Sequence, residues 1–193
     1  REIRPSRGLG DVYKRQDFAL WNSSFFAKPA NNGHATPWHQ DGQYWPIRPL
    51  ATCTVWLAID DANVENGCLR FIKGSHKEKK LKSHNINDNK NLTLNQELDE
   101  SEYNEKDAVN LTLKRGQISL HDVYLVHGSE ANNSSMARRA VTMRFMPTSS
   151  VFDHQMVKDK NLFSKLNASK YQDRKIYHMR GEDISGKNNL TYI

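Results

Sequence analysis

The stretch ATCTVWLAIDDANVENGCLRFIKGS, residues 51–75, decides the fold class that the sequence predicts. Its two ends, 51–60 and 67–75, are short runs rich in Val, Ile, Leu, Thr and Phe, with one Trp, and these residues favour β-strands. The segment between them, DANVENG, gathers Asp, Asn and Gly, which are typical of a turn. We therefore expect two strands joined by a turn.

Similar short runs lie on both sides of this stretch. Further strands are expected at 19–28, 108–116, 116–122, 123–129 and 139–147, and the one helical candidate lies around 157–171. Many short strands with few helices indicate a β sandwich or barrel, and the number of strands fits the double-sheet jelly roll that cupins share. The chain is thus expected to be mainly β, with peripheral helices.

Residues 76–108 have a different character. They are rich in Lys, Asn, Asp and Glu and hold few large apolar side chains. Such a composition buries too little apolar surface to form a core. We expect an exposed polar insertion there, partly disordered or with a short helix, because a loop this long inside a compact domain is usually either functional or disordered. His84 lies in this segment and is expected to face solvent.

The first 16 residues, REIRPSRGLGDVYKRQ, show neither helical nor strand periodicity. They resemble a translated sequencing-adapter scar, so we expect a non-native segment at 1–16, with a genuine basic arm as the alternative. The remainder, 17–193, is expected to be one domain that lacks its native N-terminus. Without residues 1–16 the net charge falls from +6 to +3, which gives no indication of a nucleic-acid partner.

No apolar run approaches the roughly 20 residues that a membrane helix needs. We therefore expect no membrane span and a cytoplasmic location.

The pattern His39-Gln40-Asp41, with His127 much later in the chain, suggests a metal site. Residues i and i+2 of a strand face the same side, so His39 and Asp41 can reach one metal, with His127 as a ligand from a distant strand. Two imidazoles and one carboxylate that leave coordination positions open suit Fe(II) oxygenases. A lone H-x-D is common by chance, so the assignment depends on the residues that come after His127.

An arginine comes after His127, on the next expected strand. An arginine there can form a bidentate hydrogen-bonded contact with a carboxylate, as an enzyme that anchors 2-oxoglutarate requires. Adjacent strand residues face opposite ways, so only one of Arg138 and Arg139 points inward, and the spacing favours Arg138. His121 shares the parity of His127 if the strand is unbroken. We expect Asp122 to break it, which favours a packed or hydrogen-bonded His121 over a ligand.

Three segments together resemble the phytanoyl-CoA dioxygenase family. They are WHQDGQYWPIRP (38–49), VWLAIDDANVENGCLRFIKGSHK (55–77) and GQISLHDVYLVHGSEANNSSMARRAV (116–141). The resemblance covers about residues 24–147 and agrees in order and spacing. It implies a double-stranded β-helix, a mononuclear Fe(II) centre, and 2-oxoglutarate and O2 as co-substrates.

The resemblance also implies roles for individual residues. The matching positions are the iron ligands His39, Asp41 and His127 and the 2-oxoglutarate residues Arg138, Ser129 and Trp56. Halogenase relatives carry a small residue in place of the carboxylate. Because Asp41 is present, the expected reaction is hydroxylation of a C–H bond in a small-molecule or acyl-type substrate, coupled to formation of succinate and CO2.

Gln43, Tyr44 and Trp45 flank the H-x-D and are candidates for a substrate pocket, with core packing an equal alternative. Three other functions stay open on the sequence alone. They are a metal-binding cupin-like module without turnover, a 2-oxoglutarate-dependent oxygenase of another outcome, and a zinc hydrolase that uses the same three ligands.

Overall fold

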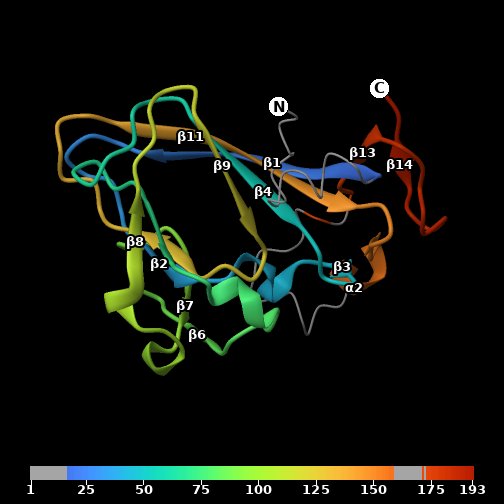
Figure 1. Ribbon diagram of the computed structural model, residues 1–193, viewed down its shortest axis with the longest axis horizontal. Coiled ribbons are helices and arrows are strands. Elements are labelled where there is room, and N and C mark those ends of the chain that lie inside the picture. The colour runs from blue at the N-terminus through green and yellow to red at the C-terminus, as the bar shows by residue number, and fades with distance from the viewer. Residues whose placement is uncertain (1–16, 159–170, 172) are drawn as a thin grey trace, which may run out of the picture.

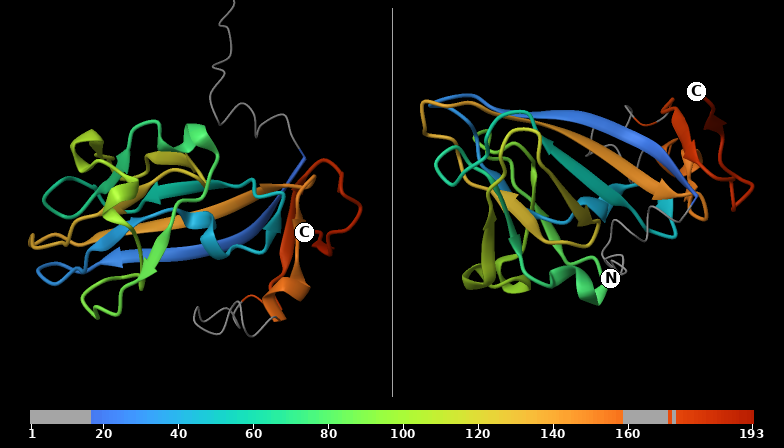
Figure 2. Two further views of the ribbon diagram at one scale, coloured as in Figure 1. Left: turned by 90° about the horizontal axis from the view of Figure 1, so that it is seen from below. Right: turned by 45° about the horizontal axis from the view of Figure 1, so that its top comes forward.

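Two β-sheets lie face to face (Figures 1 and 2). The structure is a computed structural model that describes residues 17–158, 171 and 173–193. The larger sheet has the order β14 (Leu190–Thr191), β13 (Ile176–Arg180), β1 (Phe18–Lys28), β11 (Arg138–Pro147), β4 (Cys53–Ala58) and β9 (Ile118–Asp122). The smaller sheet has the order β2 (Thr36–His39), β10 (His127–Ser129), β5 (Leu69–Ile72) and β8 (Ala108–Leu111).

Shorter elements complete the described part. The strand pairs are β3 (Ile47–Arg48) with β12 (Val151–Phe152), and β6 (His84–Ile86) with β7 (Gln96–Leu98). The helices are α2 (His154–Lys158) and the 3-10 helices η1 (Asp41–Tyr44), η2 (Ser75–Glu78), η3 (Glu100–Glu102) and η4 (Glu105–Asp107). This arrangement confirms the expected mainly β, double-sheet jelly roll with a few peripheral helices.

The expected strand at 123–129 is interrupted by a turn at its start. The N–H of Leu125 donates to the carbonyl of Asp122 over 3.0 Å, and the Asp122 carboxylate accepts from the N–H of Tyr124 over 2.9 Å. Strand β9 therefore ends at Asp122, and β10 begins only at His127 in the other sheet. The turn carries the chain from the larger sheet to the smaller one, as the turn-forming Asp122 predicts.

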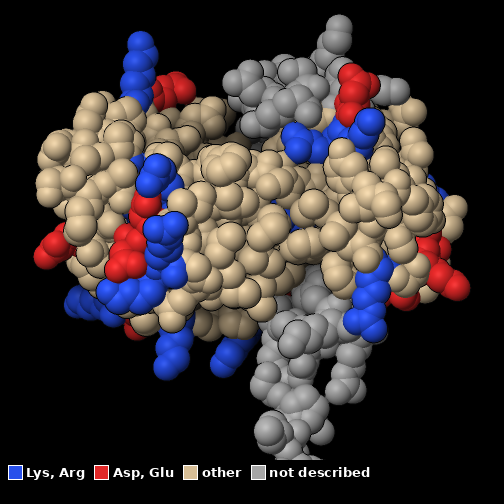
Figure 3. All heavy atoms as spheres, turned by 90° about the horizontal axis from the view of Figure 1, so that it is seen from above, with Lys and Arg blue, Asp and Glu red and all other residues tan. Residues whose placement is uncertain are grey.

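The alternation of side chains along β11 separates the interior from the outer face of the larger sheet. Arg138, Ala140, Thr142, Arg144 and Met146 are buried, and the residues between them are half-buried or exposed. In the view onto the outer face, charged side chains gather mainly at the margins (Figure 3). The inner face carries two buried arginines, Arg138 and Arg144. This is unusual, because arginine seldom lies fully buried without a partner.

The polar insertion contributes to the core, so the prediction that it forms none is wrong. Leu98 of β7 is 1% exposed and packs in a cluster with Trp38, Ile72 and Val126. Trp38 and Ile72 lie on strands of the smaller sheet, and Val126 directly precedes β10. The β6–β7 pair places Leu98 inward, and the other residues of the pair are half-buried or exposed. A low average hydropathy over 76–108 conceals such an anchoring residue.

Two further expectations concern the ends of the chain. The helix expected around 157–171 is described only at its start, α2, because residues 159–170 lie outside the described part. Residues 1–16 also lie outside it, so their foreign origin stays a prediction. In residues 17–158, 171 and 173–193 no helix combines the length and hydropathy that a membrane-spanning helix needs.

Candidate metal and co-substrate site

Three side chains from two neighbouring segments meet between the sheets. His39, Asp41 and His127 each offer one ligand atom, and these atoms all lie within 4.8 Å of one another. His39 and His127 are directly paired residues of the antiparallel strands β2 and β10, and their ring centroids are 4.2 Å apart. The register of the smaller sheet therefore fixes the distance between the two imidazoles.

Asp41 reaches the site from a helix and not from a strand, which corrects the expected local structure. Strand β2 ends at His39, and Asp41 is the first residue of η1. Gln40 between them keeps an extended conformation, with φ −114° and ψ 135°, so the alternation that aligns His39 with Asp41 persists for one residue beyond the strand. The two side chains consequently converge, with 3.8 Å between His39 Nε2 and Asp41 Oδ1.

Both histidines are held so that Nε2 faces the site. His39 Nδ1 donates to the carbonyl of Pro37 and His127 Nδ1 donates to the carbonyl of Leu125, each over 2.9 Å. A carbonyl oxygen can only accept, so each Nδ1 carries the proton and each Nε2 keeps its lone pair. A second-nitrogen hydrogen bond of this kind is the usual way in which proteins orient metal-binding imidazoles.

The charge states of these groups suit a cation. Burial lowers the pKa of His127 well below its usual value, so the ring is neutral at neutral pH. Burial acts to raise the pKa of Asp41, but its contacts with His121 and His39 and the charge of Arg144 outweigh this effect and hold the pKa well below its usual value. A neutral imidazole and an ionised carboxylate are the forms in which His127 and Asp41 would bind a metal.

His121 lies beside the three ligand candidates on β9. Its Nε2 is 3.5 Å from Asp41 Oδ2, and its ring centroid is 4.7 Å from that of His127. Thr54 Oγ1 donates to the same Asp41 oxygen over 3.3 Å. His121 and Thr54 therefore both contact the ligand candidates and hold them from the larger sheet.

A cavity of about 710 Å³ contains the ligand candidates and the residues expected to bind 2-oxoglutarate. Arg138 is 3% exposed, and its guanidinium lies 5.4 Å from the Trp56 ring and 3.5 Å from Ser129 Oγ. Two of its nitrogens donate to the carbonyl of Gly67 over 2.9 and 3.1 Å, which fixes the plane of the group. Arg139 points outward and pairs with Asp60 at 2.7 Å.

Gly128 allows the sheet to close between His127 and Ser129. A Cβ at this position would lie 2.9 Å from the carbonyl oxygen of Thr36 on the neighbouring strand. Contacts this short to backbone atoms do not occur without displacement of the strands. The glycine of the His-Gly-Ser motif is therefore needed for the close approach of β10 to β2.

Lys28 is a buried amine behind the Arg138 end of the cavity. Its Nζ donates to the carbonyls of Ser129 and Glu130, which ties the end of β1 to the end of β10. Burial, together with the charge of Arg138, lowers the pKa of Lys28 to about 7. Lys28 thus holds the Ser129 segment in place and is only partly charged at neutral pH.

Gln40 connects the metal-ligand segment with the polar insertion. Its side-chain amide donates to the carbonyls of Lys80 and Tyr124 over 3.0 and 2.7 Å, and its carbonyl accepts from the N–H of Lys82 over 2.8 Å. Its backbone N–H donates to His84 Nε2 over 3.0 Å. The side chain is 2% exposed, so these bonds lie out of water.

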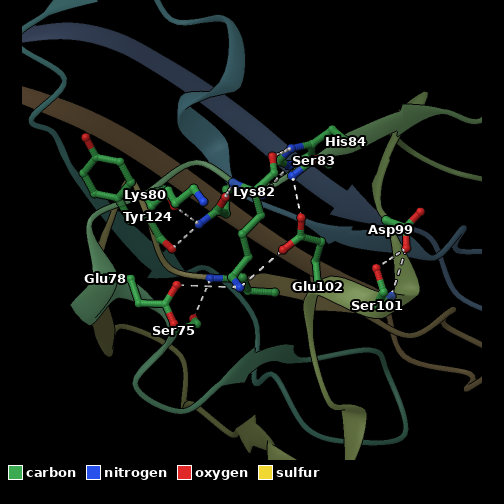
Figure 4. A network of polar contacts seen from close by, with 12 residues as sticks. Ser75, Glu78, Lys80, Lys82, Ser83, His84, Asp99, Ser101, Glu102 and Tyr124 are labelled. Carbon is green, nitrogen blue, oxygen red and sulfur yellow. Dashed lines mark hydrogen bonds and ion pairs between the residues drawn. The ribbon is translucent and has the colours of Figure 1, made fainter.

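The insertion is itself tied together around this contact (Figure 4). Lys82 Nζ lies 3.6 Å from Glu102 and 3.9 Å from Glu78, and His84 Nδ1 donates to the carbonyl of Lys82 over 2.9 Å. His84 is half-buried, which corrects the expectation that it faces solvent. That error arose because its partner, the Gln40 backbone, is distant in sequence.

The three substrate-pocket candidates have different positions. Trp45 is buried and lines the cavity, whereas Gln43 is half-buried and is not among the described residues that line it. The side chain of Tyr44 lies outside the described part. The tip of the β6–β7 hairpin, residues 87–95, contributes most of one cavity wall with a run of polar side chains.

Arg144 is a cavity residue that was not predicted from the sequence. It is 8% exposed and lines the same cavity as Arg138, from the same face of β11. The signal was present in the strand parity, because Arg138 and Arg144 are an even number of residues apart in one expected strand.

Comparisons with known proteins show similarity to one family. A family model described as Phytanoyl-CoA dioxygenase (PhyH) matches residues 7–140. The phytanoyl-CoA dioxygenase domain-containing protein 1 homolog of Dictyostelium discoideum is 34% identical over 130 residues, which are 66% of this chain and 46% of that protein. The chain thus spans about half the length of the curated relatives that it matches.

Solved structures of similar fold include one that is named a non-heme monooxygenase and one that is a 2-oxoglutarate complex. The non-heme monooxygenase ThoJ, in its apo form, has a TM-score of 0.56 at 25% identity over 70% of this chain and 48% of that one. EvdO2 from Micromonospora carbonacea var. aurantiaca, solved in complex with 2-oxoglutarate, has a TM-score of 0.54 at 29% identity. That match covers 65% of this chain and 52% of EvdO2.

Proposed function

Because the chain belongs to the phytanoyl-CoA dioxygenase family, we propose that its protein is an Fe(II)- and 2-oxoglutarate-dependent oxygenase. The proposed reaction is hydroxylation of a C–H bond in a small-molecule or acyl-type substrate. The observation that carries the proposal is one cavity that contains both the group His39, Asp41 and His127 and the buried guanidinium of Arg138.

The donor set fits Fe(II). His39 and His127 would each bind the metal through Nε2, since their Nδ1 atoms are engaged with backbone carbonyls, and Asp41 would bind through a carboxylate oxygen. Two imidazoles and a carboxylate on one side of a metal leave positions for a bidentate co-substrate and O2. The side chains of His39 and Asp41 are each 10% exposed, and His127 is buried. This burial keeps bulk water from the centre.

The residues around Arg138 fit a dicarboxylate co-substrate. Arg138 would hold the distal carboxylate of 2-oxoglutarate, with the Ser129 hydroxyl as a second donor and Trp56 as a flat wall. Burial lowers the pKa of Arg138 to about 10, so the group stays charged at neutral pH. The 2-oxoglutarate complex of EvdO2, at 29% identity, supports this assignment by similarity.

The protein's own contribution is positioning and exclusion of water. Oxidative decarboxylation of 2-oxoglutarate to succinate and CO2, with insertion of oxygen into a C–H bond, is the chemistry that a centre of this kind supplies. Asp41 completes the ligand set, and this carboxylate distinguishes a hydroxylase site from the halogenase pattern. Thr54 and His121 would hold the Asp41 carboxylate in its binding orientation.

Two rival functions predict different cavities. A zinc hydrolase that used the same ligands would have no need of a buried arginine aimed at a carboxylate, and neither would a metal-binding module without turnover. Leaving a guanidinium buried without an anionic partner is costly, which argues that a ligand supplies that partner.

The test is a turnover assay with added Fe(II), 2-oxoglutarate and O2. We expect succinate to form in proportion to a product that has gained one oxygen atom, and Asp41→Ala to abolish both. Zinc as the metal found after purification, together with no succinate from folded protein in a broad substrate screen, would favour the hydrolase. A product without added oxygen but with stoichiometric succinate would indicate an oxygenase of another outcome.

A further inference from the structure

A second buried arginine, Arg144, lies in the cavity with few partners. Its residue is 8% exposed, and its Nε has no hydrogen-bond partner among the described residues. Within the same part of the chain, its one hydrogen bond joins Nη1 to Thr142 Oγ1 over 3.3 Å. A guanidinium has five N–H donors, so the described residues leave most of the hydrogen-bonding capacity of Arg144 unused.

Aromatic rings hold this guanidinium in the cavity. Its carbon lies 5.3 Å from the Trp45 ring and 5.7 Å from the Phe26 ring, and both residues line the cavity with it. Such cation–π contacts fix the side chain but do not satisfy its N–H groups. The guanidinium and the two rings form a preformed slot in the cavity lining.

Arg144 lies on the side of the metal site that is opposite to Arg138. It is the cross-strand partner of Thr54, whose hydroxyl donates to Asp41, whereas Arg138 lies at the other end of β11 near Ser129. Six residues of a strand separate the two arginines, which places their Cα atoms roughly 20 Å apart. The two guanidinium groups therefore enter the cavity from distant positions along β11.

The charges of the cavity are unbalanced in the same direction. Among the described lining residues, the cations are Lys90, Arg138, Arg144 and Arg174, and the carboxylates are Asp41 and Asp88. In the loaded centre, Fe(II) and Arg138 would balance Asp41 and the 2-oxoglutarate dianion. Asp88 lies on the hairpin and away from the sheet interior, so the positive charge at the Arg144 end is left without a second buried counter-charge among the described lining residues.

We propose that Arg144 binds the carboxylate of an anionic substrate, which places the bond to be oxidised between Arg144 and the metal site. The inference rests on the proposed oxygenase function and names its substrate class. Arg174 lies in the same cavity lining and donates to Asn22 Oδ1 over 2.6 Å. A fork-shaped donor that is already desolvated and oriented favours a planar carboxylate.

The test compares an acid with its uncharged amide in protein loaded with Ni(II) and 2-oxoglutarate, which does not turn over. Phenylacetate and phenylacetamide are the probes, since the slot is walled by aromatic rings. Calorimetric titration should show that phenylacetate binds about tenfold or more tightly, as expected for one charge-assisted hydrogen-bonded contact. Arg144→Met should remove this preference, and Arg144→Lys should keep a weaker one.

Arg139→Met is the matched control, because Arg139 is an exposed neighbour on the same strand. It should leave the preference for the acid unchanged. Equal binding of acid and amide by the wild-type protein, or an undiminished preference in Arg144→Met, would overturn the inference. Loss of 2-oxoglutarate binding in Arg144→Met would also overturn it, because Arg144 would then serve the co-substrate.

The same titrations separate this inference from the proposed function. If 2-oxoglutarate fails to bind the metal-loaded wild-type protein, the oxygenase assignment fails. The comparison of acid and amide in wild-type and Arg144→Met protein, repeated without 2-oxoglutarate, still decides whether Arg144 binds a carboxylate.

Discussion

His39 and His127 are direct cross-strand partners on β2 and β10, and their rings lie 4.2 Å apart with both Nδ1 atoms bound to backbone carbonyls. The sheet therefore sets the spacing of the two imidazoles before any metal binds. The position of Asp41 depends on more surrounding structure than that of either histidine. It requires η1, Thr54 and the segment around Gln40. Residues that hold Asp41 and its neighbours in place are therefore expected to affect metal binding and stability.

His121 should tune metal binding without being essential to it. Its Nε2 lies 3.5 Å from Asp41, so His121→Ala removes a group that orients a ligand and leaves the ligand itself. Loss of such a partner lowers metal affinity by about 10–100-fold. Competitive titration with a chelator measures this, with exposed His34→Ala as the control. Complete loss of binding in folded His121→Ala protein would instead make His121 a ligand.

Gln40 should stabilise the protein through its buried amide. Gln40→Ala leaves two carbonyls and one N–H without their partners, which costs about 1–3 kcal/mol for each buried group left unsatisfied. Urea unfolding of the metal-free protein measures the change. The half-buried Gln43→Ala is the control, and equal unfolding midpoints for the two variants would contradict the role of Gln40.

Leu98 should anchor the insertion to the domain. Leu98→Ala deletes a fully buried side chain from its cluster with Trp38, Ile72 and Val126 and should cost about 2–5 kcal/mol of unfolding free energy. Ile86, 51% exposed in the paired strand, is the matched control, and Ile86→Ala should change stability by about 0.5 kcal/mol or less. A Leu98→Ala protein as stable as Ile86→Ala would mean that the insertion is not part of the core.

The contact between His84 and Gln40 should be sensitive to acid. Burial lowers the pKa of His84 below its ordinary 6.5, and its Nε2 must stay unprotonated to accept from the Gln40 N–H. As the pH falls below 6.5, the unfolded chain takes up a proton that the folded chain resists, so unfolding free energy declines until the pH passes the lower folded value.

The measurement is the melting temperature of the metal-free protein at about pH 7.5 and about pH 5.5. The fall between the two should be larger for the wild-type protein than for His84→Gln, whose amide oxygen can accept the same bond without titrating. Identical falls would show that His84 does not contribute to the acid sensitivity.

The sequence predicted the parts of the site that depend on strand parity. Alternation required that only one of Arg138 and Arg139 point inward, and the spacing from His127 favoured Arg138. The turn residue Asp122 separated His121 from His127. The candidate metal ligands were predicted from a short motif and one distant histidine, and the sheet register brings these three side chains together.

The errors arose where contacts join distant segments. The prediction that the insertion forms no core missed Leu98, and the expectation of a solvent-facing His84 missed its bond to the Gln40 backbone. Local composition carries no information about such partners. Arg144 is a different case. Its parity with Arg138 was readable, but nothing in the sequence indicated that most of its N–H groups lack a partner among the described residues.

The most direct test of the central claim is the visible spectrum of the protein under anaerobic conditions with Fe(II) and then 2-oxoglutarate. We predict a weak charge-transfer band that requires both additions, is lost in His127→Ala and Arg138→Ala, and persists in Arg139→Ala. No band from folded wild-type protein, or an unchanged band in Arg138→Ala at limiting 2-oxoglutarate, would contradict the account of this site.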